Sequence, residues 1–101
     1  MIQKDFDVAR NLKMTEDLQC TLLARVSDLF SSMNEKGTKA EQLELLAELQ
    51  LAVILLSGKL GISKDALDQK AISKIKLELV KEERSEWKTA LLETLATLSK
   101  K

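Results

Sequence analysis

Two acidic side chains, Glu44 and Glu48, lie four residues apart at the start of the most apolar stretch of the chain, ELLAELQLAVILLSGKL over residues 44–60. A carboxylate that enters an apolar core is costly unless its charge is balanced. Three partners would balance Glu48: a divalent metal ion in a nucleotide-hydrolysing site, a cationic side chain of a neighbouring helix, or water at an incompletely buried position. With Glu41, these acids recur at i, i+3 and i+7 and so share one stripe of a helix.

Lysine side chains further along the chain form a second candidate site. Lys70, Lys74 and Lys76 carry point charges of the kind that bind phosphate groups. Acidic residues alternate with lysines in the following stretch, which is typical of a solvated helix face. Trp87 also has two interpretations, a ring that stacks on a nucleotide base or the apolar anchor of the last helix. For both features we favour the structural interpretation.

The composition limits the chemistry. The 101 residues are enough for one domain, residues 1–101, with a small core. The chain has no histidine and a single cysteine, Cys20, which excludes an internal disulfide, zinc-finger spacing and histidine acid–base catalysis. We expect Cys20 to be a small buried apolar residue. Sixteen basic and sixteen acidic residues cancel, so neither a nucleic acid nor a membrane is an expected partner, and a cytoplasmic location is the default.

Helix formers dominate, with no proline and only 3% aromatic residues, which predicts an all-α fold. Apolar spacing predicts a first helix over residues 15–34, with Leu18, Leu22, Val26, Leu29, Phe30 and Met33 on its core face. Gly37 is expected to close this helix in the left-handed conformation. Residues 1–14 are either a short helix or an arm that packs on a partner.

Capping signals place three further helices. Thr38 and Glu41 form a capping-box pattern before a second helix that runs to Leu60, and Gly61 supplies its stop. Ser63 precedes a third helix, whose apolar stripe comprises Leu67, Ala71, Ile72, Ile75, Leu79 and Val80. A fourth begins near Ser85 and carries Trp87, Leu91, Leu95 and Leu98. The second helix is apolar almost all round from residue 49 to 56, so we predict a four-helix bundle completed by homodimerisation, with residues 45–60 near the dimer centre.

This pattern resembles the MazG-like family of the all-α nucleoside triphosphate pyrophosphohydrolase superfamily. The shared order is an acidic helix, an apolar run, Leu-Gly, a short loop and a helix with a lysine, here ELQLAVILLSGKLGISKDALDQKAISK over residues 48–74. Glu48 stands in the position of the usual Asp, and Lys70 in that of the helix lysine. NLK (11–13), TLLARVSDLF (21–30) and SEW (85–87) extend the resemblance over most of the chain.

The resemblance implies a dimeric or larger helical assembly and, in active members, Mg²⁺-dependent cleavage of a nucleoside triphosphate to monophosphate and pyrophosphate. Active members carry Glu-Glu-x-x-Glu on one helix and Glu-x-x-Asp on the next, which hold the metal. In this chain Ala24 and Arg25 stand where the first acids would be, and Asp28 remains. In the second motif Leu45 replaces the first Glu, and Glu48 remains, with Glu44 one position away.

We therefore favour a MazG-like protein that has lost most of its metal-binding acids and acts in binding or assembly, with Arg25 and Glu48 as a structural ion pair. The rival is an active, Mg²⁺-dependent pyrophosphohydrolase that uses Asp28, Glu44 and Glu48 for the metal and Lys70 and Lys74 for the phosphates of a nucleotide. Its second chain would then supply further acids. A third reading is an unrelated helical interaction module.

Overall fold

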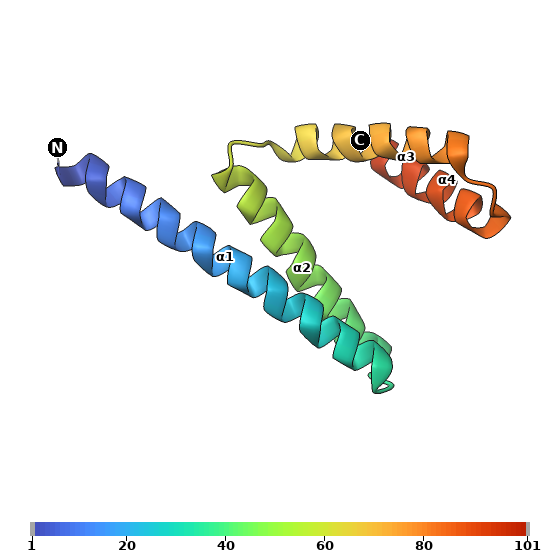
Figure 1. Ribbon diagram of the computed structural model, residues 1–101, viewed down its shortest axis with the longest axis horizontal. Helices are drawn as coiled ribbons and strands as arrows, with labels where there is room; N and C mark the ends of the chain where they lie inside the picture. The colour runs from blue at the N-terminus through green and yellow to red at the C-terminus, as the bar shows by residue number, and fades with distance from the viewer. Residues whose placement is uncertain (1, 101) are drawn as a thin grey trace. The chain divides into compact units, whose positions relative to one another are not determined.

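The computed structural model describes the backbone of residues 2–100 and the side chains of residues 8–100. Within residues 2–100 four helices follow one another: α1 (Ile2–Asn34), α2 (Lys39–Lys59), α3 (Lys64–Lys81) and α4 (Ser85–Ser99) (Figure 1). No strand occurs within residues 2–100, which confirms the all-α prediction. The chain divides into two compact units between Gly61 and Ile62, and each unit is a hairpin of two helices.

The first unit is the hairpin of α1 and α2, which lie side by side and run in opposite directions (Figure 1). Its most buried apolar side chains are Leu18 of α1 and Ala52 of α2. Half-buried leucines extend this seam along both helices: Leu22, Leu29, Leu45, Leu49 and Leu56. Away from the turn, Lys59 Nζ donates a hydrogen bond of 3.0 Å to Asn11 Oδ1. Apolar contacts along the seam, together with the hydrogen bond between Lys59 and Asn11, therefore hold the two helices together.

Helix α1 is longer than the apolar pattern indicated. It begins at Ile2 and continues to Asn34, so residues 2–14 form the first part of one continuous helix, and Met1 lies outside the described residues. Polar side chains such as Lys13 and Asp17, which form an exposed i, i+4 pair, occur along its first half. Periodicity alone misses such a segment because it has no continuous apolar face to mark it.

The turn between α1 and α2 differs from the sequence-based expectation. Lys36, with φ 59°, adopts the left-handed conformation in this turn, and Gly37 does not. Gly37 is needed for another reason: its amide donates a 2.6 Å hydrogen bond to the Ser32 carbonyl, and a Cβ on Gly37 would overlap the Ser32 hydroxyl. The glycine therefore permits a close backbone approach, while the preceding lysine reverses the chain.

The predicted starts of α2 and α3 are confirmed. The Thr38 hydroxyl accepts a 3.1 Å hydrogen bond from the Glu41 amide, and the Ser63 hydroxyl accepts one of the same length from Ala66. Each satisfies an amide that has no partner within its helix. Gly61 follows α2 in the left-handed conformation, at φ 78°, as the stop signal predicted.

The orientation of α1 corrects the predicted core. Three residues assigned to its core face are exposed, Val26 at 37%, Phe30 at 60% and Met33 at 60%. The side facing α2 comprises Leu18, Leu22 and Leu29, as predicted, together with Arg25 and Ser32. The predicted burial of Cys20 is also wrong, because this thiol is exposed. Two apolar stripes lie one residue apart on this helix, and the prediction merged them into one.

The second unit is the hairpin of α3 and α4. Ile72 and Ile75 are its buried apolar residues, and the half-buried ones are Leu67, Ala71, Leu79, Leu91, Leu95 and Leu98, as the apolar spacing indicated. Val80 was assigned to this core but is 85% exposed. Trp87 is 54% exposed, so the anchor role that we favoured for it holds only in part.

Candidate functional site

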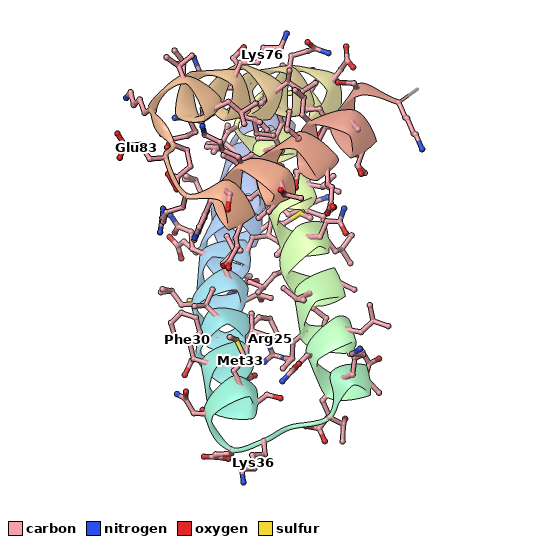
Figure 2. All side chains as sticks on the ribbon, turned by 90° about the vertical axis from the view of Figure 1, so that its right-hand side faces the viewer. Arg25, Phe30, Met33, Lys36, Lys76 and Glu83 are labelled. Atoms are coloured by element: carbon pink, nitrogen blue, oxygen red, sulfur yellow. The ribbon has the colours of Figure 1, made fainter. Side chains whose placement is uncertain are left out.

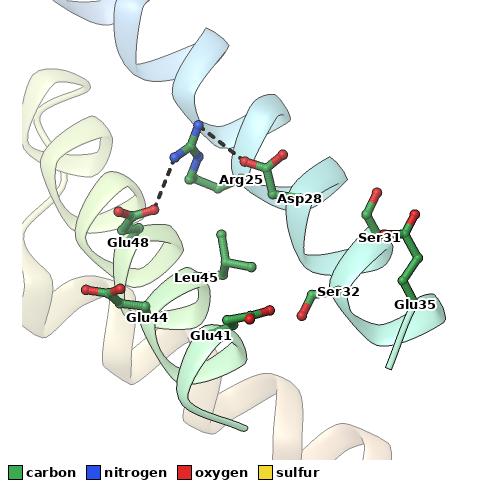
Figure 3. A pocket seen from close by; sticks show the side chains of 9 residues that line it. All are labelled: Arg25, Asp28, Ser31, Ser32, Glu35, Glu41, Glu44, Leu45 and Glu48. Atoms are coloured by element: carbon green, nitrogen blue, oxygen red, sulfur yellow. Dashed lines mark hydrogen bonds and ion pairs between the residues drawn. The ribbon is translucent and has the colours of Figure 1, made fainter. Parts of the chain in front are cut away.

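A cavity of about 470 Å³ opens between α1 and α2 near the turn of the hairpin (Figure 3). The residues that line it are Arg25, Asp28, Ser31, Ser32, Glu35, Glu41, Glu44, Leu45 and Glu48. Five of them are acidic and one is basic, so the lining has a formal charge of −4. We call this the acidic cavity. It contains all three residues named as candidate metal ligands, Asp28, Glu44 and Glu48.

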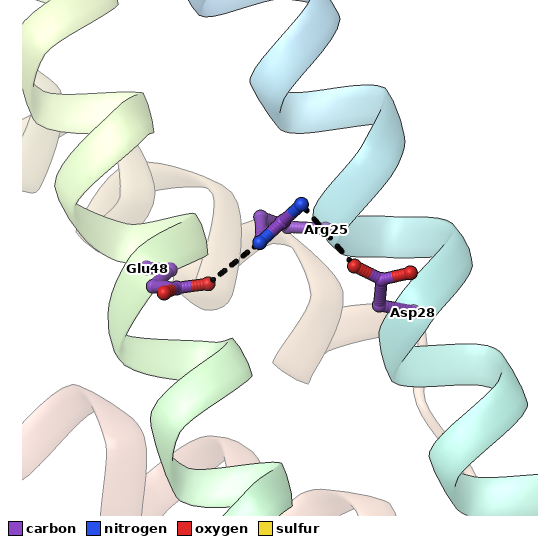
Figure 4. Close-up of polar contacts among 3 residues, drawn as sticks. All are labelled: Arg25, Asp28 and Glu48. Carbon is purple, nitrogen blue, oxygen red and sulfur yellow. Dashed lines mark hydrogen bonds and ion pairs between the residues drawn. The ribbon is translucent and has the colours of Figure 1, made fainter.

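Arg25 joins the two helices inside this cavity (Figure 4). Its Nη1 atom lies 3.3 Å from Glu48 Oε2 on α2, and its Nη2 atom lies 3.3 Å from Asp28 Oδ2 one turn further along α1. The exposed fractions of the three side chains are 35% for Arg25, 52% for Asp28 and 49% for Glu48. Partial exposure means that water screens these contacts, so each is worth roughly 0.2–1 kcal/mol.

The acids do not fit a bound Mg²⁺ ion. Within residues 8–100 no three acidic, histidine or cysteine side chains converge as a set of metal ligands. Two of the three candidate acids instead share the Arg25 guanidinium. Arg25 Nε is buried without a hydrogen-bond partner among the described residues. A guanidinium has only donors and repels a cation, so Arg25 opposes the binding of a metal ion by Asp28 and Glu48.

A smaller cavity of about 220 Å³ lies beside the Arg25–Glu48 pair. Apart from that pair, its lining consists of Leu18, Thr21, Leu51, Ala52 and Leu55. The Arg25–Glu48 ion pair therefore lies between the acidic cavity near the turn and this smaller, mostly apolar cavity.

Lys70 and Lys74, the candidate phosphate ligands, are exposed side chains of α3 and belong to the second unit. Neither forms an ion pair with another residue of the described part of the chain. They differ from Arg25 in this respect, because Arg25 is held in position by two carboxylates.

The turn between α3 and α4 contains a second charged cluster. Arg84 donates hydrogen bonds to both carboxylate oxygens of Glu82, and its guanidinium lies 4.5 Å from the centre of the Trp87 ring. Hydrogen bonding from Arg84 lowers the pKa of the Glu82 carboxyl below its usual value, and the same contact raises the pKa of Arg84. The cluster fixes the turn and leaves half of the tryptophan exposed.

The comparison with known proteins identifies the class. A model of the MazG-like family matches residues 8–97, almost the whole chain, and the chain therefore belongs to the MazG-like family. Membership relates it to the nucleotide pyrophosphohydrolases and argues against an unrelated helical module. No curated protein and no solved structure matches this chain.

No single helix within residues 2–100 is long and apolar enough to cross a membrane. Helices α2 and α3 meet that criterion only when they are taken together across the break between them.

Sequence reasoning missed one surface of the first unit. An exposed apolar row on α1 comprises Leu23, Val26, Phe30 and Met33, and a similar row on α2 comprises Leu43, Leu46 and Val53, with Leu60 directly after the helix. The sequence does contain the pattern of these rows, because within each helix their residues follow the core-facing positions by one residue. The prediction did not separate the rows from the core because the two apolar stripes lie directly beside each other.

Proposed function

We propose that this MazG-like chain acts as a binding or assembly module and not as a metal-dependent hydrolase. The observation that carries the proposal is the position of Arg25, 3.3 Å from both Glu48 and Asp28. A fixed cation between these carboxylates neutralises the charge that a divalent metal would otherwise neutralise. The sequence has a single cysteine, so the chain cannot form the internal disulfides that stabilise many proteins of oxidising compartments. We therefore expect it to act in the cytoplasm.

The test is a titration of Mg²⁺ into the purified protein, followed by a panel of nucleoside triphosphates, with pyrophosphate release measured on the same sample. We expect no heat of metal binding and no pyrophosphate. A ligand that binds only the folded state also raises the melting temperature, so thermal melts with millimolar Mg²⁺ supply an independent reading. Metal binding together with pyrophosphate release would overturn the proposal.

The second candidate function is an active, Mg²⁺-dependent nucleoside triphosphate pyrophosphohydrolase. The observation that favours it is the shared lining of one cavity by Asp28, Glu44 and Glu48. Lys70 and Lys74 would then bind the phosphates of the nucleotide. Under this function Glu48→Gln abolishes nucleotide turnover and leaves the melting temperature unchanged, whereas under the assembly function it alters stability or association only.

A further inference from the structure

The acidic cavity continues into an apolar groove on the same side of the α1–α2 hairpin. This groove is the smaller cavity, of about 220 Å³, whose lining includes Leu18 and Ala52 of the buried seam. Leu51 and Leu55 also line it, with exposed fractions of 57% and 40%. We call it the apolar groove. Its leucines leave apolar surface in contact with water, which a partner would gain free energy by covering.

The apolar groove and the acidic cavity lie in line along α2. Both are lined by Arg25 and Glu48. On α2, Glu48 lies four residues after Glu44. Leu51 follows three residues later, and Leu55 four residues after that. This spacing puts all four α2 residues on one stripe of the helix, and the stripe is about 17 Å long, about three helical turns.

Three carboxylates of the acidic cavity are available to a cationic partner. Two acids of its lining share Arg25, whereas Glu35, Glu41 and Glu44 are exposed and form no ion pair with another side chain of residues 8–100. Figure 3 shows Glu41 and Glu44 on α2 and Glu35 at the end of α1. Carboxylates without a counter-charge repel phosphate groups and attract lysine and arginine.

Arg25 marks the border between the two parts of this surface. Its side chain lies between α1 and α2 (Figure 2), 3.3 Å from a carboxylate on each helix. Because these two contacts already balance its charge, Arg25 does not neutralise the acids nearer the turn. The surface therefore changes from acidic at Glu48 to apolar at Leu51, within about one helical turn.

The dimensions favour a protein helix over a small molecule. Pockets for whole small ligands usually exceed about 300 Å³ and are mostly apolar. The apolar groove is smaller, at about 220 Å³, and the acidic cavity is lined mainly by polar and charged residues. An amphipathic helix instead lies along an extended groove and fills it with side chains at intervals of three and four residues.

We propose that this side of the hairpin binds a basic amphipathic helix of a partner protein. Two apolar side chains of that helix, one turn apart, enter the apolar groove. Lysine or arginine side chains further along the same helix pair with Glu44, Glu41 and Glu35. The partner is therefore a helix of about three turns or more, apolar toward one end and basic toward the other. This inference names the partner of the proposed binding function and rests on it.

The probe is a labelled, alanine-rich helical peptide with two leucines one turn apart near one end and two lysines one turn apart near the other. A control peptide carries glutamate in place of both lysines. Fluorescence anisotropy measures each peptide against the full chain. We expect a micromolar dissociation constant for the lysine peptide and a value at least about tenfold higher for the control, because the control brings carboxylates to an acidic surface.

Matched variants of the chain test both parts of the surface. Leu51 is 57% exposed and Leu92 of α4 is 55% exposed. Leu51→Glu should weaken binding of the lysine peptide at least about tenfold, because it brings a charge into the apolar groove, whereas Leu92→Glu should bind as wild type does. Glu44→Gln should weaken binding about threefold or more, with Glu93→Gln of α4 as its control. Circular dichroism confirms that each variant is folded.

Several outcomes would overturn the inference. These are a lysine peptide that does not bind, a control peptide that binds equally well, and a Leu92→Glu variant that loses as much affinity as Leu51→Glu. Spermidine that binds wild type and Leu51→Glu as tightly as the lysine peptide binds wild type would show that the acids alone bind an organic cation. Dissociation of a homodimer by Leu51→Glu in sedimentation would assign the groove to a second copy of the chain.

The Mg²⁺ titration is independent of this experiment. Metal binding with pyrophosphate release would refute the binding function, whatever the peptides do. A chain that is silent toward both Mg²⁺ and the lysine peptide would leave the proposed function standing and remove this partner.

Discussion

At the scale of single residues, Arg25 has the clearest predicted role. Arg25→Gln removes both ion pairs and leaves Asp28 and Glu48 facing each other across the two helices. Because the three side chains are partly exposed, we expect the free energy of unfolding to fall by about 1 kcal/mol or less. Chemical denaturation measures this, with Lys13→Gln as the control, since Lys13 forms only the exposed pair with Asp17. An unchanged stability at low salt would show that the bridge contributes nothing.

Glu82 gives a pH dependence at the same scale. Hydrogen bonding from Arg84 lowers the pKa of Glu82 in the folded protein, so the unfolded state binds this proton more readily. The contribution to stability is therefore present above the unfolded pKa of about 4.3 and is lost as the pH falls through the lower folded value. We expect wild type to exceed Arg84→Gln in stability at pH 6 and the difference to shrink progressively as the pH falls below the unfolded pKa of about 4.3. A constant difference across that range would contradict the assignment.

At the scale of the helices, the two glycines near the end of α2 should respond in opposite directions. A Cβ on Gly58 would meet no atom within 4 Å, so Gly58→Ala should raise the free energy of unfolding by up to about 1 kcal/mol through helix propensity. Gly61 has φ 78°, where a Cβ is strained, so Gly61→Ala should lower it by about 1–2 kcal/mol. Thermal melts of both variants measure the difference. If Gly58→Ala is destabilising, another helix approaches closely at that point.

The helices themselves were largely predictable from sequence, whereas their orientation was not. Thr38, Ser63 and Gly61 act through local hydrogen bonds and backbone angles, which a few adjacent residues determine. The direction in which Val26 or Phe30 points depends instead on which of two neighbouring stripes packs on α2. Both stripes fit a period of 3.6, and the one that contains Arg25 and Ser32 is the less apolar. It packs on α2 through Leu18, Leu22 and Leu29 and places Arg25 beside Glu48, and these contacts between distant residues are encoded by no local pattern.

At the scale of the whole molecule, the two sides of the α1–α2 hairpin should respond differently to salt. The Arg25 contacts are partly exposed charge pairs, whereas the exposed rows of α1 and α2 that would meet in the expected homodimer are apolar. The screening length falls from about 10 Å at 0.1 M to about 3 Å at 1 M salt, so ionic contacts weaken over this range while burial of apolar surface does not. We therefore expect the dissociation constant of the dimer to remain within about threefold between 0.1 and 1 M NaCl, measured by analytical ultracentrifugation.

Mass action links the same assembly to stability. A dimer that forms only from folded chains raises the midpoint of thermal unfolding as the protein concentration rises. We expect this rise for wild type over a hundredfold range of concentration, and expect it to be absent for Leu46→Glu, whose chains remain separate. Leu92→Glu should follow wild type, because Leu92 is an exposed residue of α4, outside the exposed apolar rows of α1 and α2. If the wild-type midpoint did not change with concentration, folding would not be coupled to association, and the expected homodimer would be contradicted.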